Sequence, residues 1–371
     1  MKKVYVVLAA TVLMGLILLT GCRNPEVEGV VINMQQGLYE KAYDLAKDAV
    51  VKYPEDPEAW YLLGELHGRF QKYQEMNEAF NKSLALSDKY KSEIEQLRLK
   101  HFAENYNDAL KNYYNPAREA EDLAKRKELF EKAAEKFLFA HRAMPSRIEP
   151  LTPMSVSFLE SGDTAQAEKY ILQAVEMNPA NDTLMVAVGD FYFKIYKLQN
   201  AKNMYEKALA VNPENVDAML ALGEIYTREK NWDKALEFFP QAMQRQPDNP
   251  AIPNNIAIIL YNNEKYEEAI PYLLKTIELE PSNQNAYEVL SLCYMQSAQK
   301  YTDKFAETED TQYRDQALAT YQKALSFLED ATTRFPDSTL LWNNLGVTYA
   351  QLGMKDKAEE AFERQKQLEE M

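Results

Sequence analysis

The 371-residue sequence predicts an all-α protein built from repeated helical hairpins, on three observations. First, helix-ending residues recur at intervals of 34, 57, 34, 34, 34, 34 and 55 residues. They stand at Pro54, Asp88, Pro145, Pro179, Pro213, Pro247, Pro281 and Pro336. Second, each interval holds two apolar runs at helical spacing, and third, a polar elbow such as Ser161-Gly162-Asp163 separates them. A fixed period of this length is typical of a solenoid, in which each unit buries its apolar face against its neighbours.

Small and aromatic residues occupy matching slots in successive units. The unit that ends at Pro213 has Gly189 and Tyr192 in its first run, then Ala201 and Tyr205 in its second. The equivalent residues of the next unit are Gly223, Tyr226, Ala235 and Phe239. Small residues allow two helices to approach closely, and the aromatic residue fills the remaining space. A proline has no backbone donor, so it ends the second helix.

This pattern resembles the tetratricopeptide repeat, whose motif is W-x2-L-G-x2-Y, then A-x3-F-x2-A, then P. The last unit matches it with Trp342, Leu345, Gly346, Tyr349, Ala358 and Phe362. The resemblance implies a right-handed superhelical solenoid of antiparallel hairpins over residues 29–371. We expect about nine repeats, at residues 25–56, 57–90, 91–147, 148–181, 182–215, 216–249, 250–283, 284–338 and 339–371.

Two repeats are longer than the rest but keep the phase of the pattern. Their surplus of about twenty residues equals about three extra helical turns in each helix of the hairpin. In the first, a turn is expected at Asn115-Pro116. In the second, it is expected at residues 307–310. These two elongated hairpins are either additional docking arms or tolerated extensions, and the sequence leaves both readings open.

The N-terminus predicts export and lipid attachment. Lys2-Lys3 precede an uncharged apolar run, Val4–Leu19, as in a secretory signal. The run is short for a membrane-spanning helix, which makes an uncleaved anchor the weaker alternative. The sequence Leu19-Thr20-Gly21-Cys22 resembles the lipobox of bacterial lipoproteins. The resemblance implies a signal peptide at 1–21, acylation of Cys22, and a short tether at 22–28.

The same resemblance implies a place in the cell envelope. In enterobacterial lipoproteins an aspartate after the lipidated cysteine favours the inner membrane. Arg23 stands there, so in a Gram-negative cell we expect the outer membrane, on its periplasmic or its surface face. The net charge of −15 becomes −17 without Lys2 and Lys3. Such an acidic surface argues against nucleic acid as a partner.

The sequence contains no constellation typical of an enzyme, so we expect no catalysis, cofactor or metal. The three histidines, His67, His101 and His141, are scattered, and His67 occupies a slot filled elsewhere by tyrosine. Once Cys22 is acylated, Cys293 is the remaining thiol, and its slot predicts a small buried residue. No phosphate-binding loop or metalloprotease motif is present.

Binding therefore becomes the expected function, in the groove that the first helices of the hairpins line in this family. Candidate groove residues are Asn254, Asn255, Ile258, Tyr261, Asn262, Asn343, Asn344 and Val347. Family members with asparagine at the slots of Asn255 and Asn344 clamp the backbone of an extended peptide, and an amide can donate and accept at once. The alternative is that the Asn-Asn pairs are solvated or cap helices. We therefore expect a membrane-tethered adaptor that binds a protein or extended peptide. The runner-up is a lipoprotein that binds glycan or peptidoglycan through its tyrosines.

Overall fold

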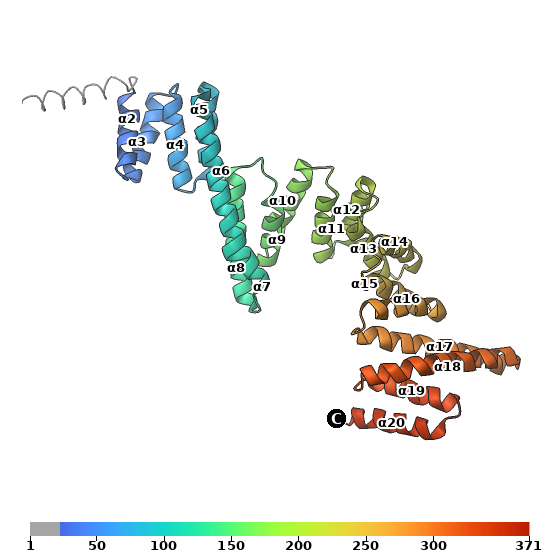
Figure 1. Cartoon of the computed structure of the whole chain (residues 1–371). Helices are drawn as coiled ribbons and strands as arrows, with labels where there is room; N and C mark the ends of the chain where they lie inside the picture. The colour runs from blue at the N-terminus through green and yellow to red at the C-terminus, as the bar shows by residue number, and fades with distance from the viewer. Residues whose placement is uncertain (1–22, 371) are drawn as a thin grey trace, which may run out of the picture. The chain divides into compact units, whose positions relative to one another are not determined.

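The computed structural model describes residues 23–370, and this part of the chain is helical, with short elbows between helices. The chain divides into two compact units: the first ends at Pro179, and the second begins at Ala180. Cys22 and the preceding signal sequence lie outside the described residues. Figure 1 shows consecutive helices pairing as hairpins along each unit. The predicted all-α fold of repeated hairpins is therefore confirmed.

The first unit contains four hairpins. Their helices are α2 (Pro25–Gln35) with α3 (Tyr39–Lys52), α4 (Pro57–Arg69) with α5 (Tyr73–Leu86), α6 (Lys91–Asp108) with α8 (Leu123–Ala143), and α9 (Leu151–Ser161) with α10 (Thr164–Met177). A 3₁₀ turn, Asp88–Tyr90, precedes α6. A π-helical segment, Ala109–Tyr114, and the short α7 (Asn115–Glu119) follow it.

The second unit contains five hairpins. Their helices are α11 (Asp182–Lys194) with α12 (Leu198–Val211), α13 (Val216–Arg228) with α14 (Trp232–Arg245), α15 (Ala251–Asn262) with α16 (Tyr266–Leu279), α17 (Gln284–Thr308) with α18 (Thr311–Arg334), and α19 (Thr339–Gln351) with α20 (Lys355–Glu369).

The two elongated hairpins are present, but one of their turns differs from the prediction. The α17–α18 turn lies at Glu309 and Asp310, within the expected segment. The turn expected at Asn115-Pro116 is instead at residues 120–122. Proline is tolerated in the first turn of a helix, where its missing N–H costs no intrahelical bond, so Pro116 lies in the first turn of α7 instead of ending the helix. The turn ends where Asp122 accepts a hydrogen bond from the backbone N–H of Lys125, at 2.7 Å, and caps α8.

Four of the standard hairpins, those that contain Gly64, Gly189, Gly223 and Gly346, are closed by an aromatic ring that lies on the glycine. A Cβ atom at Gly189 would lie 2.4 Å from Tyr205 Cε1, and one at Gly223 would lie 2.7 Å from Phe239 Cε2. Both rings are about 1% exposed. Because no side chain larger than hydrogen fits beneath these rings, the glycines fix how closely the two helices of a hairpin approach. The slots predicted for helix contact are therefore confirmed.

Candidate protein-binding groove

A cavity of about 470 Å³ lies between the first helices of two adjacent hairpins in the second unit. Helices α13 and α15 form its walls, and Phe239 of α14 lies behind them. Asn215 caps α13 by accepting from the N–H of Ala218 at 2.9 Å. Just before α15, Asn249 accepts from the N–H of Ala251 at 3.1 Å. The lining residues are Leu220, Ala221, Glu224, Thr227, Phe239, Ala251, Ile252, Asn255 and Ile258. We call this the groove cavity.

Two of the predicted groove residues line this cavity. Asn255 and Ile258 are half-buried on α15 and lie one helical turn apart. They share the cavity with Leu220 and Glu224 of α13. An amide beside an apolar surface can hydrogen-bond a peptide backbone while an apolar side chain fills the space next to it. The role of Asn255 as a peptide clamp stays a prediction.

The neighbours of Asn255 on α15 are placed differently. The Oδ1 atom of Asn254 is buried without a hydrogen-bond partner, and Asn254 does not line the groove cavity. The ring of Tyr261 packs edge-on against Tyr266, with centroids 5.5 Å apart. Asn262 is exposed at the end of the helix. These three predicted residues therefore do not line the groove cavity.

The asparagine pair of the last hairpin lies elsewhere, on α19. Asn344 is 5% exposed, and its Nδ2 donates to Ser291 Oγ of α17 at 2.8 Å. Its Oδ1 accepts from Asn343 Nδ2 at 3.3 Å. Asn343 and Val347 are half-buried. The amide of Asn344 thus joins α19 to the elongated hairpin, and the sequence-based expectation that it faces a ligand like Asn255 does not match this position.

The charges in and near the groove are largely paired. Arg228 Nη2 lies 2.7 Å from Glu224 Oε1, and its guanidinium lies 4.7 Å from the centre of the Phe193 ring. In the preceding hairpin, the Tyr205 hydroxyl of α12 donates to Asp190 Oδ1 of α11 at 2.7 Å. Burial raises the pKa of Asp190, while this hydrogen bond opposes the rise. The groove therefore combines apolar surface with paired carboxylates, which suits a neutral or basic peptide better than an acidic one.

Some lining residues were not among the candidates. Ala251 and Ile252 begin α15, and Thr227 and Ala221 face them from α13. The repeat register places the first helices side by side, but it does not reveal where two of them leave a gap. Pro250, just before α15, was the available sequence signal that this helix begins late.

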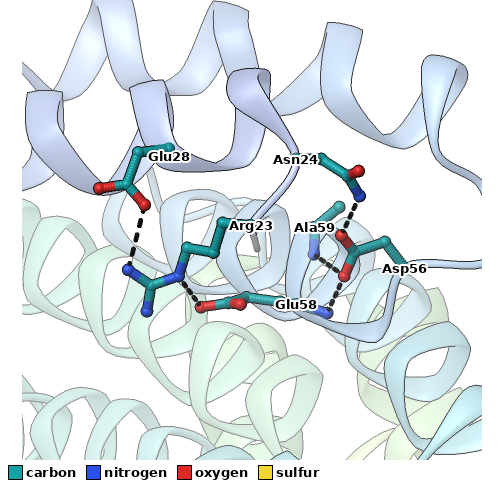
Figure 2. Close-up of polar contacts among 6 residues, drawn as sticks. All are labelled: Arg23, Asn24, Glu28, Asp56, Glu58 and Ala59. Carbon is teal, nitrogen blue, oxygen red and sulfur yellow. Dashed lines mark hydrogen bonds and ion pairs between the residues drawn. The ribbon is translucent and has the colours of Figure 1, made fainter. Parts of the chain in front are cut away.

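The N-terminal end of the described chain is held by polar contacts (Figure 2). Arg23 Nε lies 3.0 Å from Glu58 Oε1, and Arg23 Nη1 lies 3.4 Å from Glu28 Oε2. Asn24 Nδ2 donates to Asp56 Oδ2 at 2.7 Å, and Asp56 also caps α4. The short tether expected at residues 22–28 is shorter than predicted, because α2 begins at Pro25 and residues 25–28 are helical.

The residues considered for chemistry are packing residues. Cys293 is fully buried, and burial raises the pKa of its thiol to about 12. The ring of His67 packs edge-on against Tyr43, with centroids 5.3 Å apart. Among residues 23–370, no group of three or more histidine, cysteine, aspartate or glutamate side chains could hold a metal ion. In the same part of the chain, every helix is too short or too polar to cross a bilayer.

Comparison with known families agrees with the hairpin architecture. Four family models, each described as the tetratricopeptide repeat, match residues 33–90, residues 154–181 and 340–370, residues 196–254, and residues 254–279. Together they cover more than half of the chain. These matches and the closed hairpins define a helical-repeat scaffold. The chain is a tetratricopeptide-repeat protein, and this family supports interaction with proteins or peptides.

Solved structures are similar at low identity. The C-terminal part of a TPR repeat-containing protein from Cytophaga hutchinsonii has a TM-score of 0.51 at 16% identity, over 69% of this chain and 95% of that one. A tetratricopeptide repeat protein from Parabacteroides merdae has a TM-score of 0.42 at 17% identity, over 71% and 93%. YrrB, described as a TPR protein with an unusual peptide-binding site, has a TM-score of 0.44 at 21% identity, over 53% and 91%. The first of these supports a shared fold and nothing beyond it. No curated protein matches the sequence.

Proposed function

We propose that this protein is a lipid-anchored adaptor of the bacterial cell envelope, which binds an extended peptide of a partner protein in the groove cavity. The observation that carries the binding role is the cavity itself. It brings the amide of Asn255 together with the apolar side chains of Leu220 and Ile258. Its volume of about 470 Å³ lies within the usual range for ligand sites.

The anchoring part of the proposal is supported by the sequence before the first helix. Only Arg23 and Asn24 separate the lipobox-like Leu19-Thr20-Gly21-Cys22 from the first residue of α2, Pro25. Both of these residues contact the start of α4 (Figure 2). An acyl chain on Cys22 would therefore hold the first hairpin close to the membrane surface, with little free chain between them.

The glycan alternative has no comparable support among the described residues. The tyrosines at the repeat slots are buried: Tyr192 is 5% exposed, Tyr226 is 7% exposed and Tyr349 is 7% exposed. A sugar ring stacks on the open face of an aromatic side chain, and these faces are covered by neighbouring helices. We therefore retain the adaptor as the proposed function.

Site-specific photocrosslinking in cells tests the binding role. A photoreactive amino acid replaces Asn255, and a matched control replaces Glu237, which is exposed on the second helix of the preceding hairpin. The proposal expects one dominant protein adduct from position 255 and not from position 237. An adduct pattern that is the same at both positions would contradict binding in the groove.

Fractionation tests the anchor. The wild-type protein is expected in the membrane fraction, and Cys22→Ala is expected to release it or to leave an unprocessed precursor. Mass spectrometry of the mature N-terminus then reports whether Cys22 carries acyl chains. A membrane-bound, unmodified Cys22→Ala protein with its leader intact would favour the uncleaved anchor instead.

A further inference from the structure

A second cavity, of about 530 Å³, lies between α16 and the elongated hairpin α17–α18. It is separate from the groove cavity, because the two share no lining residue. A smaller cavity of about 220 Å³ adjoins it and shares Glu267, Ser297 and Tyr301 with it. We call the pair the hairpin cavity. It lies at the side of a hairpin that is longer than its neighbours.

Two polar atoms at this cavity have no hydrogen-bond partner. Ser297 is 2% exposed, and its Oγ is unpaired. The buried Oε1 of Gln316, on the facing helix α18, is also unpaired. Buried polar atoms in folded proteins are nearly always hydrogen-bonded, because an unpaired one loses its water without compensation. Two such atoms lining one cavity, from two helices, point to a ligand that brings hydrogen-bonding groups.

A further acceptor comes from a proline within α16. Pro271 has no N–H, so the backbone carbonyl of Glu267 lacks its usual donor within the helix. The carboxylate of Glu267 also accepts from the Tyr301 hydroxyl, which raises the pKa of Tyr301 to about 12. The cavity therefore offers an acceptor at Gln316 and a hydroxyl at Ser297 that can donate or accept, and the freed carbonyl belongs to a residue at its edge.

The rest of the wall is partly apolar. Ile270 and Leu274 of α16 line it, and Leu274 is 46% exposed. An aliphatic side chain inserted here would cover Leu274. The ligand must therefore combine N–H donors with an aliphatic group.

We propose that the hairpin cavity binds an extended peptide segment through its backbone and one aliphatic side chain. An extended backbone presents free N–H and C=O groups at each residue, which match the side chains of Gln316 and Ser297. A helical ligand would not suffice, because its backbone N–H groups are already paired beyond the first turn. The chain would then hold two peptides at once, one in the groove cavity and one at the elongated hairpin.

A selection experiment on the full chain tests this site. A phage-displayed library of random heptapeptides is selected on the wild-type protein and depleted on Ala319→Trp. Ala319 is exposed and lines the cavity, so a tryptophan there blocks it at little cost to the fold. Ala306→Trp is the matched control, because Ala306 is exposed on the same hairpin and does not line the cavity.

Selected peptides with blocked ends are then measured by fluorescence anisotropy. We expect Ser297→Ala and Gln316→Leu each to weaken binding about fivefold to tenfold, without lowering the thermal unfolding midpoint, because the deleted Oγ and Oε1 atoms have no partner in the free protein. Ala319→Trp should abolish binding, whereas Ala306→Trp and Asn255→Ala should leave it unchanged.

Other outcomes overturn the assignment. A library that yields no peptide depleted by Ala319→Trp would refute the site. Peptides that bind equally well to the Ser297→Ala/Gln316→Leu double variant would refute the recognition chemistry. Loss of binding in Asn255→Ala alone would assign the peptides to the groove cavity, and displacement by chitotriose would assign the hairpin cavity to a glycan.

Discussion

Replacing Gly189 by alanine should open the α11–α12 hairpin. The new Cβ would lie 2.4 Å from Cε1 and 2.7 Å from Cδ1 of Tyr205, both far inside van der Waals contact. The ring cannot swing away easily, because it is 1% exposed and its hydroxyl donates to Asp190 at 2.7 Å. Overpacking of this kind costs about 1–3 kcal/mol. Alanine returns about 1 kcal/mol through helix propensity, and disturbing the Tyr205 hydrogen bond costs about 1 kcal/mol more, so we expect a net loss of about 1–3 kcal/mol.

Gly29→Ala is the matched control. Its Cβ would meet Leu45 Cδ1 at 3.5 Å, which is ordinary contact, so helix propensity decides and the variant should gain about 1 kcal/mol. Repeat proteins open locally, so amide hydrogen exchange in α11 and α12, compared with α2 and α3, is the appropriate assay. Each kcal/mol changes the exchange rate about fivefold.

The reasoning also predicts a rescue. Tyr205→Leu in the Gly189→Ala background leaves room for the methyl group, so the two changes together should cost less than their sum. If Gly189→Ala protected its hairpin as much as Gly29→Ala protects its own, the close approach of ring and glycine would not be what fixes the hairpin geometry.

Three further predictions concern single side chains. Hydrogen bonds from Lys52 and Tyr53 lower the pKa of Glu26 from 4.5 to about 2, so its contribution to stability should be complete above pH 4.5 and disappear towards pH 2. Amide hydrogen exchange in α2 should show this acid dependence, and the Glu26→Gln variant should lack it. Cys293 should resist iodoacetamide at pH 8 in the native protein and react after unfolding, because burial raises its thiol pKa to about 12; rapid native labelling would contradict that burial. Asn344→Ala should lower the free energy of unfolding in urea by about 1–3 kcal/mol, because it removes the buried hydrogen bond to Ser291, and should leave photocrosslinking from position 255 unchanged. A variant that keeps its stability but loses the adduct would show that Asn344 contacts the ligand.

The sequence predicted the parts of the fold that repeat. Gly189 and Gly223 could be recognised as helix contacts because the same slot recurs at a fixed interval with an aromatic partner in the second helix. The elbow at Gly162 was predicted likewise, and its φ of +102° is one that glycine adopts without strain. Periodicity sufficed here because each contact is local to one hairpin.

The sequence was a weaker guide where the outcome depends on a distant partner. Asn255 and Asn344 occupy equivalent slots, yet only Asn344 faces a serine, Ser291, which is 53 residues away on an elongated helix. Asn115-Pro116 predicts a turn, but proline occurs both in the first turn of a helix and just after its end, and the neighbouring residues do not distinguish these two positions. The hairpin cavity was not predicted at all, since it arises where helices of unequal length meet.

The ring-on-glycine closure also bears on how such a chain can change its length. Gly64 with Phe80, Gly189 with Tyr205, Gly223 with Phe239 and Gly346 with Phe362 repeat one joint within separate hairpins. A duplication or deletion of 34 residues at these positions would carry its own joint with it and leave the neighbouring joints intact. Loss of α17–α18 would in addition remove the Asn344–Ser291 bond, so the last hairpin depends on the elongated one for a buried polar contact.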